Sequence, residues 1–144
     1  MRALRRLAVS CLGLLTLAVV TAPGVARGQV ARHPSEIPIH LQVSTRLMRS
    51  ALENIGDRER ADSMTWQAYV QLRDAQAKLQ NLNALAKFPN PLYGAAIPQV
   101  QEARNHLLNA QHVLKYRDPA EAPVAAGEIG EALRVIEALL LTTF

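Results

Sequence analysis

Cysteine is almost absent from this sequence of 144 residues, and the one that is present lies in a segment that export would remove. Cys11 falls within a mostly apolar run, Leu7–Val20, which follows three arginines in residues 1–6. The small residues Ala26 and Gly28 come after the run. A basic start, an apolar run and a small-residue end predict a secretory signal peptide over residues 1–28. The mature chain would then contain no disulfide, thiol nucleophile or cysteine metal site.

The expected mature chain also lacks surplus charge of either sign. The whole sequence has 16 basic and 12 acidic residues, which give a formal net charge of +4. Cleavage after Gly28 would remove four arginines and no acid, leaving 12 basic and 12 acidic groups in 116 residues. Nucleic acid is therefore not an expected partner, because neutralisation of phosphates supplies much of the affinity for it.

A signal peptide predicts export, and so a periplasmic or secreted bacterial protein. The apolar run falls short of the roughly 20 residues that a spanning helix needs, so no stable membrane insertion is expected after cleavage. An uncleaved anchor remains an alternative. Arg5 and Arg6 leave open the twin-arginine export route in place of the general secretory one.

The rest of the chain predicts an all-α fold, an up-down-up-down four-helix bundle over residues 38–144 after an extended leader over residues 29–37. Apolar and small residues recur at alternating spacings of four and three, which is a heptad pattern. We expect helices at about residues 38–55, 60–87, 97–117 and 123–142. The heptad positions of the last three are Ala61, Thr65, Ala68, Leu72, Ala75, Leu79, Leu82 and Ala86; Ala96, Val100, Ala103, Leu107, Ala110 and Leu114; and Ala122, Ala125, Ile129, Ala132, Ile136 and Leu139.

The second and third predicted helices share the pattern L-x-x-A-Q-x-x-L, first at residues 72–79 and again 35 residues later at 107–114. A helical repeat array would need a turn inside each unit, and the second helix contains no breaker. The favoured interpretation is two helices built to one heptad rule. Among the amides of the second helix, Gln67, Gln71 and Gln76 are expected on its outer face.

Helix boundaries follow from glycine, proline and capping residues. Gly56 is expected to end the first helix in a left-handed conformation, and Asp57, Asp62 or Ser63 to cap the second. A proline-rich loop is expected over residues 88–98, with Pro98 in the first turn of the third helix. Residues 119–122 are expected to form a separate turn before the last helix.

Aromatic residues are scarce, and their positions suggest where a partner could bind. The expected loop concentrates Phe88, Leu92, Tyr93 and Ile97, which would either close the end of the bundle or form an exposed apolar surface. Trp66 and Tyr69 lie beside the heptad seam of the second helix, where they would form the rim of the core or stack on a ligand. These six residues are the candidate partner-binding residues.

Metal and cofactor chemistry has little support in the sequence. His33 and His40 are expected in the leader and the first turn, and His112 is expected to point outward from the third helix. Met48 and His106 could ligate a haem iron from different helices, but no C-x-x-C-H motif accompanies them. No cofactor is expected, and a haem- or metal-binding bundle is kept as the alternative function.

No motif for nucleophilic catalysis, phosphate binding or zinc hydrolysis occurs in the sequence. Most acidic residues are spaced for exposed ion pairs within one helix. We therefore expect a non-enzymatic interaction or accessory protein whose partner is a protein or a small apolar ligand. A structural homo-oligomer is a further alternative, suggested by the apolar run Leu139–Leu141 near the chain end.

Overall fold

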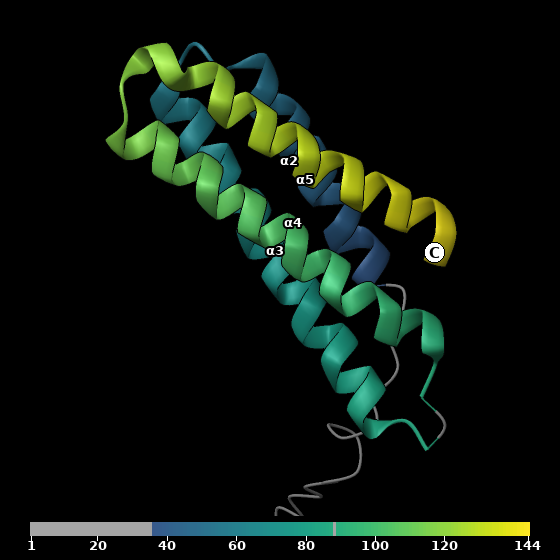
Figure 1. Cartoon of the computed structure of the whole chain (residues 1–144). Helices are drawn as coiled ribbons and strands as arrows, with labels where there is room; N and C mark the ends of the chain where they lie inside the picture. Colours follow the sequence, from purple (N-terminus) through teal and green to yellow (C-terminus); the bar gives the residue numbers. More distant parts are fainter. Residues whose placement is uncertain (1–35, 88) are drawn as a thin grey trace, which may run out of the picture.

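The computed structural model describes residues 36–87 and 89–144, and four α-helices account for most of them (Figure 1). No strand occurs in these ranges, so the all-α prediction is confirmed. The predicted signal peptide and all but the last two residues of the predicted leader lie outside the described residues. The elements are α2 (Glu36–Glu53), α3 (Arg58–Leu85), α4 (Pro91–Tyr116), a 3-10 turn η1 (Pro119–Glu121) and α5 (Ala122–Thr143).

The helices pack side by side in chain order, and α5 returns to pack against α2. Side-chain contacts show that α2 and α3 run in opposite directions. Glu36 and His40, near the start of α2, contact Lys78 and Gln71 of α3 in reverse order. The α3–α4 pair is antiparallel in the same way, as Figure 1 shows. Each helix therefore buries its apolar side against two neighbours around a common core.

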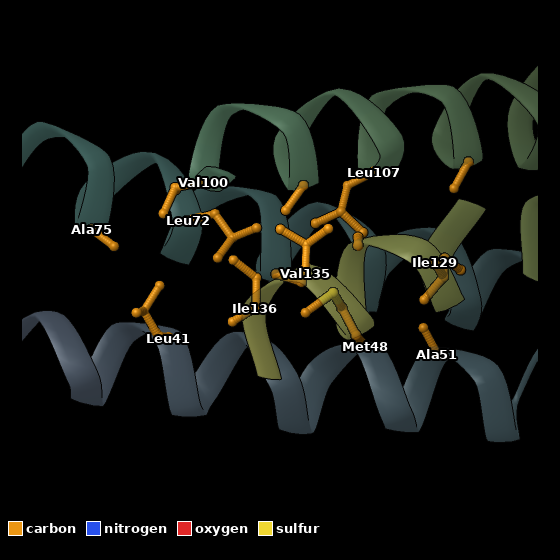
Figure 2. Packing of buried hydrophobic residues seen from close by; sticks show 14 of the residues in the cluster. Leu41, Met48, Ala51, Leu72, Ala75, Val100, Leu107, Ile129, Val135 and Ile136 are labelled. Carbon is orange, nitrogen blue, oxygen red and sulfur yellow. The ribbon is translucent and has the colours of Figure 1, made fainter. Parts of the chain in front are cut away.

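The heptad positions form this core, as predicted. Every expected seam residue from Ala61 to Leu79 in α3 is buried, as are all six in α4. Figure 2 shows Leu72, Val100, Leu107, Met48 and Ile136 meeting in the middle of the bundle. Alanine alternates with leucine or isoleucine along the seams, which lets helix axes approach closely while the larger side chains fill the layers. Burial of this apolar surface is the main stabilising contribution.

The first helix is longer at its start than the sequence pattern indicated. It begins at Glu36, and Ile37, which was assigned to the leader, is fully buried. Ser44 interrupts the apolar stripe but is also fully buried, because its hydroxyl donates to the Leu41 carbonyl at 2.7 Å. A buried hydroxyl that is hydrogen-bonded in this way costs little.

The α2–α3 connection corrects one expectation and resolves another. Gly56 does not take the predicted left-handed conformation. Instead the backbone tightens after Glu53, and the Asn54 side chain donates to the Ser50 carbonyl at 2.7 Å. Asp57 is the cap of α3, accepting a hydrogen bond from the backbone N–H of Arg60 at 3.2 Å. The backbone N–H of Asn54 also donates to the carbonyls of Ser50 and Ala51, so these two groups are satisfied without a glycine cap.

The prediction of a loop over residues 88–98 is wrong, because α4 begins at Pro91. Asn90 caps the helix by accepting from the backbone N–H of Leu92 at 3.0 Å, and proline suits the first helical position. Pro98 therefore lies inside the helix rather than in its first turn. It cannot donate to the Gly94 carbonyl, and its ring crowds that group, which destabilises a helix interior.

At the other end of α4 the separate turn predicted over residues 119–122 is present as η1, although it ends at Glu121 and Ala122 already belongs to α5. Asp118 caps η1 by accepting from Ala120 N at 2.8 Å, and Pro123 falls at the start of α5. The α4 carbonyl groups are also satisfied here. Nη2 of Arg58 donates to the carbonyl oxygens of Val113 at 2.9 Å and Arg117 at 2.8 Å, and to that of Leu114. A cation at a helix C-terminus is favourable both as a donor and as a charge.

The α3–α4 pair extends past the start of α2. Glu36 begins α2 and pairs with Lys78, whereas α3 continues to Leu85. Seam burial consequently fades along this extension, and Ala86, predicted as a seam residue, is exposed. Leu85 is 72% exposed. Within residues 36–87 and 89–144, no helix has the length and apolar character needed to cross a membrane.

Candidate partner-binding site

The residues of the predicted apolar loop do not stay together, because most of them belong to the first turns of α4. Phe88 lies outside the described residues. Tyr93 and Ile97 pack against the core, and the Tyr93 ring stacks on Phe144 with ring centroids 5.9 Å apart. Leu92, one turn before the core positions, is 53% exposed. Two of these residues thus close the bundle end, and the structure does not gather the group into one surface.

Trp66 and Tyr69, by contrast, come together on the outside of α3. Their rings stack with centroids 5.2 Å apart and planes inclined by 15°. Tyr69 also packs against the core, whereas 47% of Trp66 is exposed. Trp66 is the one tryptophan of the sequence. A large aromatic ring held in place on one side and open to solvent on the other is typical of binding surfaces.

Arg104 of α4 completes this arrangement from the neighbouring helix. Its Nη2 donates to the Tyr69 hydroxyl at 2.7 Å, and its Cζ lies 4.8 Å from the centre of the Tyr69 ring. Its Nη1 donates to Oε1 of Gln76 at 2.5 Å and to Oε1 of Gln101 at 3.3 Å. The partly buried guanidinium is therefore fixed by three neutral side chains and by the face of an aromatic ring.

Tyr69 and Arg104 occupy equivalent positions relative to the two copies of the sequence pattern, although the pattern by itself does not set the register in which they meet. In an antiparallel pair of helices, equivalent positions of a repeat can face each other, and Tyr69 and Arg104 are separated by the same 35 residues as the two patterns. The glutamines of the patterns, Gln76 and Gln111, are both buried in the α3–α4 seam. Gln76 contacts Arg104, and Gln111 donates to Asp62 at 3.1 Å. The expectation that Gln76 lies on the outer face is therefore wrong.

No acidic side chain of the described residues pairs with Arg104. It takes part in none of the ion pairs found among the described residues. Its three hydrogen bonds occupy Nη1 and part of Nη2, and its buried Nε has no hydrogen-bond partner. A guanidinium carries five N–H groups, so the unused donors include the Nε–H and one N–H of Nη2. Such an unsatisfied buried donor is costly unless another molecule supplies an acceptor.

The two residues considered for haem have different surroundings. Met48 of α2 is fully buried in the core (Figure 2). His106 of α4 is partly buried, and its Nδ1 lies 2.6 Å from Oε2 of Glu128 on α5. Because α2 and α4 each pack mainly against α3 and α5, they stand diagonally across the bundle. The structure thus places Met48 among core side chains and engages His106 with a carboxylate.

The other histidines are also placed. His40, within α2, donates through Nδ1 to Gln71 Oε1 at 2.7 Å, and His112 is exposed on α4, as expected. His33 lies outside the described residues. In the part of the chain that the structure describes, no group of three or more histidine, cysteine, aspartate or glutamate residues could hold a metal ion.

Comparison with known proteins identifies no relative from which the role of this site could be inferred. No family model, no curated protein and no solved structure matches this chain. What the site can do therefore follows from its own residues.

The set of site residues is accordingly redrawn. Trp66 and Tyr69 were identified from the sequence, whereas Arg104, Gln76 and Gln101 were not. No local signal in the sequence could have found Arg104, because its contact with Tyr69 depends on the register of α3 against α4. Exposed apolar rings beside a cation with unused donors suit recognition of another molecule.

Proposed function

We propose that this chain is exported by a cleaved signal peptide and acts outside the cytoplasm as a non-enzymatic interaction module. In this proposal the mature protein is an up-down-up-down four-helix bundle, and it binds a protein partner at the outer surface of α3 and α4. We call this surface, made of Trp66, Tyr69, Arg104 and Leu108, the α3–α4 surface.

The main support for this proposal is that Trp66 is exposed on a helix whose inward positions are packed in the core. On α3, Trp66 lies between Asp62, which contacts Gln111 of α4, and Tyr69, which contacts Arg104. On α4, Leu108 lies between Arg104 and Gln111. Trp66 is 47% exposed and Leu108 is 42% exposed on the same stretch of the helix pair. Tryptophan, tyrosine and arginine are the residues that contribute most often to binding energy at protein interfaces.

The α3–α4 surface is tested by comparing variants in a crosslinking experiment on the native cell envelope. Trp66→Ala should lose partner crosslinks that the unmodified protein forms, because the ring supplies the apolar anchor. Leu85→Ala is the matched control, since Leu85 is 72% exposed but lies at the end of α3. Equal crosslinking by Trp66→Ala and the unmodified protein would refute the assignment of this surface.

Export is tested separately by cell fractionation and sequencing of the mature N-terminus. The proposal expects the protein outside the cytoplasm with Gln29 as its first residue. Recovery of the intact chain beginning at Met1, in the cytoplasm, would refute it. This outcome is independent of the crosslinking result.

A structural homo-oligomer is the second candidate, and one observation favours it. Leu141 is 88% exposed near the end of α5, and Ile39 of α2 is 57% exposed. Apolar side chains left open in this way can be covered by a second copy. Sedimentation would show a defined dimer that Leu141→Glu dissociates. A monomer over the whole concentration range would exclude this candidate.

A further inference from the structure

Among the described residues, the guanidinium of Arg104 contains the one buried side-chain donor that has no hydrogen-bond partner. It is held from one side by Gln76, Gln101 and Tyr69, and it forms no ion pair with an acidic residue in the ranges 36–87 and 89–144. Its Nε is buried and unpaired. An arginine is costly here, because a neutral residue would avoid both the desolvation of a charge and the unsatisfied donor.

The N–H groups of Arg104 that lack an acceptor indicate which chemical group could bind to it. Both N–H groups of Nη1 face the glutamine oxygens, and one N–H of Nη2 faces the Tyr69 hydroxyl. In a guanidinium, the Nε–H and one N–H of Nη2 lie along the same edge, and Nη2 has one recorded acceptor for its two N–H groups. Two parallel donors on one edge match the two oxygens of a carboxylate, which arginine binds as a bidentate pair.

We propose that the Nε–Nη2 edge of Arg104 receives a carboxylate of the partner protein, an aspartate or glutamate side chain next to an apolar group. The apolar group lies against the exposed part of Trp66. This inference rests on the proposed binding role of the α3–α4 surface and names the chemistry that the surface recognises. Because Nε is buried, the carboxylate reaches it only after a covering side chain moves, and binding therefore alters the environment of the Trp66–Tyr69 stack.

The test uses phenylacetate, a small carboxylate with an aromatic ring, and phenylacetamide, its uncharged counterpart of nearly the same shape. Both are titrated into the mature protein while the Nε–Hε resonance of Arg104 and the fluorescence of Trp66 are followed. Phenylacetate should shift the resonance saturably, with a dissociation constant of about 1 to 10 mM, as expected for one anchoring group. Phenylacetamide should bind at least about tenfold more weakly, because the charge-assisted pair is lost.

Variants locate the response. Arg104→Lys keeps the charge but loses the planar edge, so the tryptophan response to phenylacetate should weaken about tenfold or more. Arg73→Lys is the matched control, since Arg73 is exposed on α3 and paired with Asp74. It should respond like the unmodified protein. Circular dichroism verifies that each variant is folded, and the comparison of the two ligands on the unmodified protein does not depend on any variant.

Two results would overturn the inference. A resonance that does not saturate by about 100 mM phenylacetate, or an equal response to phenylacetamide, would show that the edge does not select a carboxylate. A micromolar dissociation constant would identify a free small carboxylate as the ligand and reject a partner side chain. If phenylacetate fails to bind but Trp66→Ala still loses its partner crosslinks, the proposed function stands and only the carboxylate is rejected.

Discussion

The inward and outward faces of the helices follow different rules. Inward positions repeat one arrangement, in which Ala103, Leu107 and Ala110 of α4 are all fully buried. Outward positions carry features that folding does not require, among them Pro98 inside α4 and the half-exposed Trp66. The contrast teaches that stability is concentrated in a regular core, while the irregular residues of the surface are where a function would be found.

The contrast is sharpest at two adjacent leucines. Leu107→Ala should lower the free energy of unfolding by about 3 kcal/mol, because it removes a fully buried side chain and leaves a cavity. Leu108→Ala, one residue on and 42% exposed, should change it by less than about 1 kcal/mol. Urea denaturation measures both. Similar losses for the two variants would show that Leu108 also belongs to the core.

An outward residue should also be able to weaken the fold. Pro98→Ala is expected to stabilise the protein by about 2 kcal/mol, since it restores a donor for the Gly94 carbonyl and removes the ring that crowds it. Pro98 is exposed, so no buried contact is lost. Pro91→Ala at the first position of α4 is the control and should be neutral or slightly destabilising. A loss of stability in Pro98→Ala would show that the proline is needed for packing.

Gln76 is a buried polar residue at the α3–α4 seam, and we expect its replacement to have an intermediate effect on stability. Gln76→Ala is expected to destabilise by about 1.5 kcal/mol, because it takes an acceptor from Arg104 in a buried environment. Gln67→Ala, on the exposed side of the same helix, should change stability by less than about 0.5 kcal/mol. Thermal and urea unfolding compare them. Equal effects would mean that the Arg104 contact is energetically unimportant.

The smallest expected effect concerns a glycine on the outside of α5. Gly127→Ala should stabilise by about 0.5 to 1 kcal/mol, since alanine is the better helix former and nothing lies within 4 Å of the added carbon. The reverse change at the preceding residue, Ala126→Gly, should cost a similar amount. A destabilised Gly127→Ala would contradict the absence of any packing role for this position.

Periodicity was sufficient to predict the core and most of the fold. Spacings of three and four identified the buried positions of α3, α4 and α5, because a helix turns a regular set of residues toward one side. It failed where one local signal has two meanings. Asn90-Pro91 was interpreted as a break, although an asparagine cap followed by proline also begins a helix. Gly56 was expected as a left-handed cap, but Asn54 satisfied the carbonyls first.

The candidate site could be predicted only in part. Trp66 and Tyr69 lie three residues apart, so their proximity follows from helix geometry alone. The meeting of Arg104 with Gln76 and Tyr69 depends on the register of two helices, which no local pattern specifies. Likewise, His106 could be placed on the flank of α4, but its contact with Glu128 required knowing which helix lies beside it.

The 35-residue separation of Tyr69 and Arg104 also bears on how the protein avoids assembling incorrectly. Because α3 and α4 carry the same pattern, two copies of α4 could associate in the register that α3 and α4 use. That pairing would set one Arg104 against another, whereas the native pairing sets Arg104 against the ring and hydroxyl of Tyr69. Repulsion in the wrong pair and attraction in the right one would together favour pairing of α3 with α4 of the same chain over pairing of two copies of α4.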